Sequence, residues 1–476
     1  MKKKLLWIIA ALVLCVLCVV AIVILQKDSG EHDHDHGDSE IPQDSSSQSF
    51  HTSDVLTSRA DIKSVTVTSG GESFTVTAGQ GGEAHIEQLE GIKQNVQLEN
   101  ALIELCKGLR AQRVVEQDTD DLARYGLNEP KGKGVITYND GTSVTVLVGE
   151  ASPADERLFY AAVEGQRRVV LIEGNAQIYF TGNVRDYVSQ AISPQPQKTA
   201  AGSAKMTVSK QGADDIVLER SGESWSMSAP IKAQLDAEKS SGTVNGLYGL
   251  NAEYCEVIRP DDAAKAKYGL DKPAVTVRLK DGELDLTLKI GNAAVRGDDS
   301  EKERYFCTIE GADGTNCIYA VAKEYLPWVD ITAAGLLSDI MLPNYLVNIK
   351  RLDITLGGKT HEYLITNEGG QNDRINEDVS KVRTVKVTSA GRELDLEKFR
   401  ELYEHLMKCP TNKIYTKDVK GDASISAVYH KNDGSADRLE LVKTDEGFGA
   451  RVNGQMSYLV DKAWADKLTA MIDALE

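Results

Sequence analysis

Three histidines near the start of the chain alternate with carboxylates and could bind a metal. The run EHDHDHGD places His32, His34 and His36 beside Asp33 and Asp35. Imidazole and carboxylate groups are both ligands of borderline metals such as zinc and nickel. A flexible tract, however, must be ordered on binding and has no neighbouring groups to orient its ligands. Two interpretations stand: weak capture of zinc or nickel, or a solvated spacer whose charge changes near about pH 6.5.

The cysteines suggest one disulfide at most. Cys15 and Cys18 form a C-x-x-C pattern, but inside an apolar segment that cannot stabilise a thiolate, so we interpret both as small apolar fillers. Cys307 and Cys317 flank a predicted hairpin tip. They could pair or stay free, because spacing alone does not fix the Cβ geometry that a disulfide requires. An odd number of cysteines outside the apolar segment excludes a fully paired framework.

Catalytic patterns are missing from the sequence. It contains no G-x-S-x-G, H-E-x-x-H or phosphate-loop motif. His85, His361 and His430 occur singly, and we interpret them as surface or cap residues; His405 reads as a solvated residue of a helix. Carboxylates are too abundant for any pair to be selected without knowing their separation in space. We therefore predict a protein that is not an enzyme and needs no cofactor.

The N-terminal region predicts a membrane anchor. Residues 5–25, LLWIIAALVLCVLCVVAIVIL, carry no charge and follow the sequence MKKK. About 20 apolar residues cross a bilayer, and basic residues stay on the cytoplasmic side. The end of the segment has no A-x-A cleavage pattern, which argues against a cleaved signal peptide. We expect a cytoplasmic stub at residues 1–4, a single transmembrane helix at 5–25 and an extracytoplasmic remainder.

Composition limits what the remainder can be. Residues 26–58 are rich in His, Asp and Ser and poor in large apolar residues, which predicts a disordered stalk. The whole chain has 476 residues, 41% of them hydrophobic, which is enough for several folded domains. Its formal net charge of -18 argues against nucleic acid as a partner, because phosphates are bound by basic surfaces.

The folded part repeats itself three times. Each unit begins with short strands around Gly-rich turns, continues with a helix and ends with a second set of strands. The predicted helices include one beginning after Asp236 and one beginning after Asp395, both good capping residues. We predict an α+β fold of three tandem related units, each an antiparallel sheet plus helix, at residues 59–195, 204–335 and 346–476, with the third the most divergent.

A six-residue block, Tyr-Gly-Leu-x-x-Pro, occurs in the first two units. Its residues are Tyr125, Gly126, Leu127 and Pro130 in the first copy, and Tyr268, Gly269, Leu270 and Pro273 in the second. Glycine after a helical turn favours a left-handed helix end, and the proline prevents the helix from resuming. We predict helical turns at 120–125 and a helix at 260–268 that begins with Pro260. The alternative is that Tyr125 and Tyr268 are exposed and bind a ligand.

A hairpin follows each block. A two-residue turn at Asp281 and Gly282 would pair Lys280 with Glu283 and Arg278 with Asp285, leaving Val275, Val277 and Leu279 on an apolar face. The first copy, YNDGT, fits a three-residue loop with Gly141 in the left-handed conformation, which places Ile136 opposite Val144.

The order of these pieces resembles the bacterial family called domain of unknown function 4340. The second unit carries Trp225 and Pro230, the Tyr268 block, Asp281-Gly282, Ile290-Gly291 and Tyr305-Phe306; the first has Val148-Gly149 and Phe159-Tyr160 but no equivalent tryptophan. The resemblance implies an anchored extracytoplasmic protein, often encoded beside ABC transporters of the gliding-motility type. It implies no catalytic residues.

Three functions are compatible with the sequence. The first is a non-enzymatic accessory or interaction component of an ABC-transporter-associated envelope system, whose partners would be a transporter permease or other envelope proteins. The second is a module that binds a cell-wall or extracellular ligand through sheet faces or clefts between units. The third is an envelope hydrolase.

Overall fold

The computed structural model describes residues 56–79, 81–196, 202–294, 302–368, 383–409 and 413–475. These described residues belong to one compact unit. The predicted transmembrane segment 5–25 and the stalk histidines His32, His34 and His36 lie outside the described residues. Within the ranges that are described, no helix combines the length and the apolar character needed to cross a bilayer.

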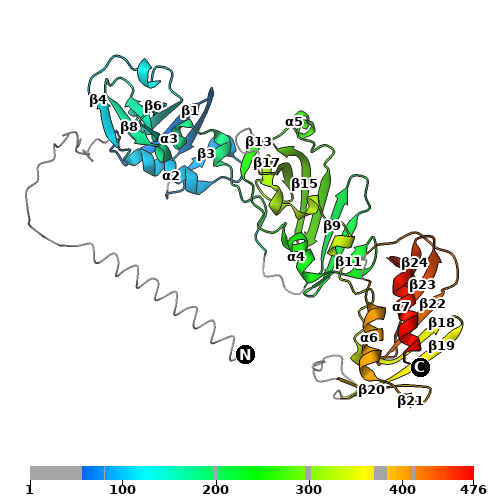
Figure 1. Cartoon of the computed structure of the whole chain (residues 1–476). Helices are drawn as coiled ribbons and strands as arrows, with labels where there is room; N and C mark the ends of the chain where they lie inside the picture. The colour runs from blue at the N-terminus through cyan, green and yellow to red at the C-terminus, as the bar shows by residue number, and fades with distance from the viewer. Residues whose placement is uncertain are drawn as a thin grey trace, which may run out of the picture. The chain divides into compact units, whose positions relative to one another are not determined.

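The described residues form three antiparallel sheets with few helices, which is the predicted α+β class (Figure 1). The first sheet has the order β3-β2-β1-β5-β6-β7-β8-β4. Its strands are β1 (Ile62–Ser69), β2 (Glu72–Thr77), β3 (His85–Ile86), β4 (Arg113–Glu116), β5 (Gly132–Tyr138), β6 (Ser143–Ser152), β7 (Asp155–Val163) and β8 (Val169–Glu173). The helical elements of this module are η1 (Glu87–Leu89), α2 (Val96–Lys107), η2 (Ala123–Tyr125), α3 (Gly174–Thr181) and η3 (Val184–Tyr187).

The second sheet repeats this plan in the order β12-β11-β10-β9-β14-β15-β16-β17-β13. Its strands are β9 (Ala204–Lys210), β10 (Ile216–Ser221), β11 (Ser224–Ala229), β12 (Ala233–Gln234), β13 (Tyr254–Ile258), β14 (Val275–Asp281), β15 (Leu284–Ala294), β16 (Arg304–Glu310) and β17 (Cys317–Ala322). Its helical elements are α4 (Ala237–Asn245), α5 (Asp262–Lys267), η4 (Lys323–Tyr325), η5 (Pro327–Val329) and η6 (Ala334–Leu336).

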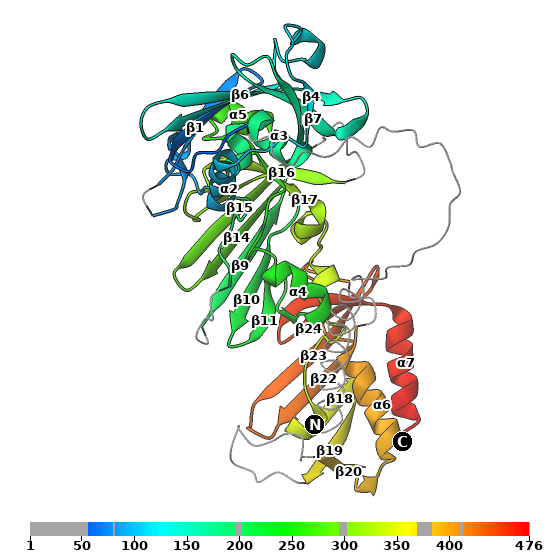
Figure 2. The same ribbon diagram turned by 90° about the vertical axis from the view of Figure 1, so that its left-hand side faces the viewer.

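The third sheet has the order β21-β20-β19-β18-β22-β23-β24-β25. Its strands are β18 (Ile349–Leu356), β19 (Lys359–Glu368), β20 (Arg383–Ser389), β21 (Arg392–Glu393), β22 (Ile425–Lys431), β23 (Ala436–Thr444), β24 (Gly447–Val452) and β25 (Gln455–Val460). The helices are η7 (Leu346–Asn348), α6 (Leu396–Met407) and α7 (Lys462–Asp473), and α6 and α7 lie side by side against this sheet in Figures 1 and 2.

All three sheets share the same strand-pairing pattern. This shared pattern shows that the chain contains related repeats. The first strand of each module lies in the interior of its sheet and pairs with the strand that follows the helix: β1 with β5, β9 with β14, and β18 with β22. The first two sheets also end in an extra edge strand, β4 or β13. In the third sheet the described residues contain only an isolated bridge, between Ile414 and Tyr458, at that edge.

The helix starts follow the predicted capping residues. The side chain of Asp236 accepts hydrogen bonds from the backbone of Glu238 and Lys239 at the start of α4, and Asp395 does the same for α6. Carboxylates at this position satisfy N–H groups that have no partner within the helix. The apolar stripe of α6 packs into the core through Phe399 and Leu402, both fully buried.

The prediction for the helix before the second block was wrong at its start. Pro260 does not open it; α5 runs from Asp262 to Lys267, and Asp261 caps it by accepting a hydrogen bond from the backbone of Ala264. A carboxylate oxygen can satisfy a free N–H group, whereas proline at the first position only avoids having one. In the first module the predicted helical turns shorten to η2, a single 3-10 turn.

One predicted hairpin register is confirmed and the other is wrong by two residues. In the first module Ile136 pairs with Val144, and Gly141 has φ 84°. In the second module Lys280 pairs with Asp285, and the last pair is Asp281 with Leu284. The two-residue loop is therefore Gly282-Glu283, with a positive φ of 60° at Gly282, as in a type II′ turn. A shift of two residues keeps Val275, Val277 and Leu279 on the apolar face, as predicted.

Two histidine predictions were also wrong. His405 is half-buried between α6 and α7, where its ring stacks on Trp464 at a centroid distance of 4.6 Å and its Nε2 lies 2.9 Å from the carbonyl oxygen of that residue. His361 is buried on the core face of β19. Both environments are made by elements distant in sequence, which local spacing does not reveal.

Candidate functional site

The Tyr-Gly-Leu block ends a helical turn in the same way in both copies. Gly126 and Gly269 have φ values of 68° and 74°, in the left-handed region. The backbone N–H of Leu127 donates to the carbonyl of Leu122, and that of Leu270 donates to the carbonyl of Lys265. A hydrogen bond spanning five residues after a left-handed glycine is the Schellman helix end. The glycine of the block therefore serves the backbone.

The backbone of each block packs against a second glycine, more than twenty residues later in the chain. A Cβ atom on Gly149 would lie 2.1 Å from the carbonyl oxygen of Tyr125, and one on Gly291 would lie 2.2 Å from that of Tyr268. The carbonyl of Tyr268 also accepts a hydrogen bond from the backbone of Asn292, at 2.9 Å. The block and the Val-Gly or Ile-Gly pair are thus two halves of one contact, in which the helix end lies directly on strand β6 or β15.

Each tyrosine of the block is buried and bonded to a glutamate. Tyr125 is 4% exposed and its hydroxyl donates to Glu116 at 3.0 Å; Tyr268 is 8% exposed and its hydroxyl donates to Glu256 at 2.9 Å. Burial and the neighbouring Glu116 raise the pKa of Tyr125. Glu116 and Glu256 lie on the equivalent edge strands β4 and β13, and the sequence analysis missed them. The available signal was an acidic residue in the strand before each block.

An aromatic ring completes each tyrosine site. The Tyr125 ring meets Tyr160 edge-on with centroids 4.8 Å apart, and Tyr268 meets Phe306 at 4.5 Å. The two clusters are separate from the main core and lie on the opposite face of their sheets, because Leu147 and Ile318 alternate along their strands with residues of the main core. The block therefore covers the outer face of the sheet, and the alternative with two exposed tyrosines is not what the structure has.

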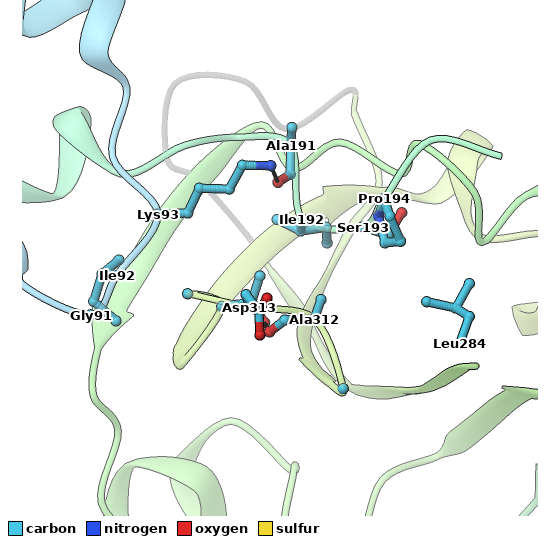
Figure 3. Close-up of a pocket in the computed structure, with 13 residues that line it drawn as sticks. Gly91, Ile92, Lys93, Ala191, Ile192, Ser193, Pro194, Leu284, Ala312 and Asp313 are labelled. Atoms are coloured by element: carbon cyan, nitrogen blue, oxygen red, sulfur yellow. Dashed lines mark hydrogen bonds between the residues drawn. The ribbon is translucent and has the colours of Figure 1, made fainter. Parts of the chain in front are cut away.

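A pocket of about 610 Å³ lies where three loops meet (Figure 3). The loops are the segment before α2, the segment after η3 and the turn between β16 and β17, and the pocket is lined by Gly91, Ile92, Lys93, Ala191, Ile192, Ser193, Pro194, Leu284, Gly311, Ala312, Asp313, Gly314 and Thr315. The Lys93 ammonium group donates to the carbonyl of Ala191 at 3.3 Å, and the Ser193 hydroxyl accepts from the backbone of Leu250 at 2.7 Å. The Ser193 hydroxyl thus holds the backbone of Leu250 in place.

A second pocket, of about 650 Å³, borders the second copy of the block. Its lining includes Tyr268, Glu256, Lys267 and Arg185. Arg185 donates to the backbone carbonyl of Glu256 at 2.9 Å, and the Lys267 ammonium lies 4.9 Å from the Tyr268 ring centroid. Tyr268 therefore forms part of a pocket wall while remaining buried. The charges of this pocket are mixed, with cations and carboxylates side by side.

The third module contains a His–Asp contact on the outer face of its sheet. His430 Nε2 lies 2.9 Å from Asp353 Oδ2, and Arg351 Nη2 lies 3.0 Å from each of them. An acyl-transfer site would need a nucleophile within hydrogen-bond reach of the histidine. Ser426 is on the same face of β22 but four residues away, which is about 13 Å along a strand. The contact reads as a surface ion-pair network.

The histidines that could bind a metal, His32, His34 and His36, lie outside the described residues. In the portion of the chain that the structure covers, no group of three or more His, Cys, Asp or Glu side chains could hold a metal ion. Among the described residues the five cysteines, including Cys307 and Cys317, are buried and form no disulfide.

Comparison with known proteins identifies the family of the chain. No curated protein and no solved structure matches it. The family model described as Domain of unknown function (DUF4340) matches residues 95–273 and again residues 225–420, which together are more than half of the sequence. The first match contains both Tyr-Gly-Leu blocks, and the second contains the Tyr268 block. The chain belongs to the family of the domain of unknown function 4340.

Proposed function

We propose that this protein is a non-enzymatic, membrane-anchored extracytoplasmic component that serves an ABC-transporter-associated envelope system through protein contacts. The uncharged segment 5–25 after three lysines supports the anchor, and the polar composition of residues 26–58 supports a stalk. The family resemblance supports the association with a transporter.

The observation that carries the proposal is the use of the duplicated block. Tyr125 and Tyr268 are buried against glutamate and aromatic partners, and the glycines are used for close backbone contact. Residues duplicated for a catalytic role would present reactive groups to solvent. The tyrosines and glycines of the two blocks instead hold a helix end against a sheet. The repeats therefore support a scaffold that presents surfaces to other proteins.

The anchor is tested by membrane extraction of the full chain. We expect the protein to stay in the membrane pellet at alkaline pH, and a variant lacking residues 5–25 to be released. External protease should digest the C-terminal region in intact spheroplasts. Release of the full chain by alkali, or its protection from external protease, would contradict the predicted topology.

The partner is tested by photo-crosslinking in native membranes. A photoreactive residue at Tyr345, which is 69% exposed, or at Leu364, which is 48% exposed, samples two surface positions without disturbing the core. A photoreactive residue at the buried Tyr363 serves as the matched control. We expect ABC permease peptides from exposed positions only. Their absence, together with pelleting of the protein with purified cell wall, would contradict the transporter proposal.

A ligand-binding module is the second candidate, and the two pockets favour it. Both have volumes in the range of small-molecule sites, and both carry cations and carboxylates. Lys93→Ala and Lys267→Ala would each lower retention of the protein on cell wall if the corresponding pocket binds a wall fragment. An envelope hydrolase would require turnover of peptidoglycan fragments by the purified protein.

A further inference from the structure

Four charged side chains of both signs line the second pocket. They are Arg185 in η3, Lys267 at the end of α5, Glu256 on β13 and Glu72 on β2. In the part of the chain that the structure describes, none of the four forms an ion pair. Buried charges in proteins are normally paired, because burial removes hydration that a partner must replace. Arg185 and Glu256 are half-buried, so the pocket holds charges that are available to a ligand.

Hydrogen bonds link both cations of the pocket to Glu256. Arg185 Nη1 donates to the backbone carbonyl of Glu256 at 2.9 Å. Lys267 Nζ donates to the Tyr268 hydroxyl at 3.3 Å, and that hydroxyl donates to Glu256 Oε1 at 2.9 Å. Arg185 thus meets a neutral carbonyl, and a neutral hydroxyl lies between Lys267 and Glu256. These bonds hold two cations and a carboxylate close together without joining them in an ion pair.

Apolar side chains form another part of the pocket wall. Phe74 is 2% exposed, and Val184 and Ile258 are half-buried. The volume of about 650 Å³ is within the range of sites for small organic ligands and exceeds what a single ion needs. An occupant of this pocket therefore meets both signs of charge and an apolar surface.

We propose that this pocket binds a short peptide with free ends, whose carboxylate lies between Arg185 and Lys267 and whose ammonium group lies against Glu256. A simple anion would be repelled by Glu256 and Glu72, and a simple cation by Arg185 and Lys267. A ligand that carries both charges a short distance apart complements both sets. The planar guanidinium of Arg185 also matches the geometry of a carboxylate. A side chain of the peptide would then pack on Phe74.

This ligand class goes beyond the role in a transporter system and rests on the second candidate function, ligand binding. Retention on cell wall and binding of a free peptide are separate measurements. If Lys267→Ala lowers retention on cell wall but no peptide binds, the pocket takes a wall ligand of another class and only the peptide proposal fails. If a peptide binds while retention is unchanged, the peptide proposal holds and binding to the wall through this pocket fails.

The test is isothermal titration of the purified full chain in detergent with two dipeptides, L-alanyl-L-alanine and L-leucyl-L-leucine. We expect a Kd below about 1 mM for at least one of them. Replacing the carboxylate of that dipeptide by an amide, or acetylating its amino group, should each weaken binding by about tenfold. The proposal is overturned if neither dipeptide binds at about 10 mM, or if the free and capped forms bind equally.

A matched set of variants assigns the two charges of the peptide. Lys267→Gln should weaken binding of the free dipeptide about tenfold and leave binding of the amide unchanged, because the amide has no carboxylate to lose a partner. Glu256→Gln keeps an acceptor for the Tyr268 hydroxyl, and it should weaken binding of the free dipeptide but not of the acetylated form. Lys265→Gln is the control, since Lys265 lies on the same helix outside the pocket and pairs with Asp262. Equal losses for free and capped ligands would show that the substituted residues act only through the fold, which contradicts the proposal.

Discussion

The carbonyl oxygen of Tyr268 lies 2.2 Å from the point that a Cβ atom on Gly291 would occupy. The same relationship holds between Tyr125 and Gly149, at 2.1 Å. Two short sequence features that look independent therefore meet in each of the first two modules. The glycine on the strand is required because the helix end of the block approaches its backbone directly.

Gly291→Ala should destabilise the second module. The added methyl group would overlap a backbone carbonyl that is itself hydrogen-bonded to Asn292, so the strand or the helix end must move. We expect a loss of about 1–3 kcal/mol in the free energy of unfolding, measured by urea denaturation. Gly242→Ala in α4 is the control, since its Cβ meets nothing within 4 Å and alanine favours a helix. Equal effects of the two substitutions would refute the contact.

Asp281→Ala and Asp285→Ala should differ greatly although both remove a carboxylate of the same hairpin. Asp281 accepts from Arg220 at 2.7 Å and from the Tyr248 hydroxyl at 2.6 Å, and the side chains of the ion pair are 15% and 5% exposed. Breaking a buried pair leaves an uncompensated charge and costs about 3–5 kcal/mol. Asp285 pairs with Arg278 in solvent, at side-chain exposures of 41% and 61%, which is worth about 0–1 kcal/mol.

Thermal or chemical unfolding of the two aspartate variants at neutral pH provides the measurement. Asp281→Ala should unfold at a much lower denaturant concentration than the parent protein, and Asp285→Ala at nearly the same concentration. The interpretation fails if the two midpoints coincide.

Glu99 should make the stability of the first module fall as pH rises. Its carboxylate on α2 is fully buried and has no hydrogen-bond partner among the described residues, and the nearby buried Tyr187 hydroxyl has none either. Burial raises the pKa of Glu99 from 4.5 to about 7. The folded state therefore keeps a proton that the unfolded state loses, and stability decreases between pH 4.5 and about pH 7, where the cost becomes complete.

Glu99→Gln tests this pH dependence. The neutral amide should remove the decline between these pH values and stabilise the protein at pH 8 by on the order of 2 kcal/mol. Glu104→Gln on the same helix is the control, because its side chain is 67% exposed. Unfolding curves recorded from pH 5 to pH 8 should diverge only for the Glu99 variant, and parallel curves for all three proteins would be inconsistent with a buried charge at Glu99.

His405 should act in the opposite direction in the third module. Burial lowers its pKa from 6.5, and its ring stacks on Trp464. The folded state favours the neutral ring. The stabilisation that the neutral His405 provides is therefore complete above its unfolded-state pKa of about 6.5, and it is lost as the pH falls through the lower pKa of the folded state. His405→Gln should reduce the acid sensitivity of the near-ultraviolet signal of Trp464. His85 is exposed, so His85→Gln is the control and should leave the acid sensitivity of the Trp464 signal unchanged.

Local sequence patterns predicted those features of the fold that depend on residues close in sequence. The left-handed glycines Gly126 and Gly269 and the caps Asp236 and Asp395 follow from backbone geometry within one turn. The apolar face of the second hairpin follows from the alternation of side chains along a strand. These rules need no knowledge of distant partners.

The errors arose where a distant residue determines the outcome. The hairpin register shifted by two residues because Arg220 and Tyr248 hold Asp281 in the strand instead of the turn. His405 looked solvated because helical spacing does not show that α7 packs beside α6. The glutamates that bind the tyrosines of the blocks lie on edge strands formed only when the sheet is complete.

The position of the first strand in each sheet has a consequence for how the chain folds. Val65 pairs with Ile136, Val208 with Val277, and Leu352 with Tyr429. Contacts over such separations, about 70 residues each, require costly loop closure and slow the folding of a domain. A module that emerges N-terminus first during synthesis therefore leaves its first strand with one free edge until the strand after the helix has emerged. The first strand of each repeat therefore gains its second neighbour only after about 70 further residues have been made.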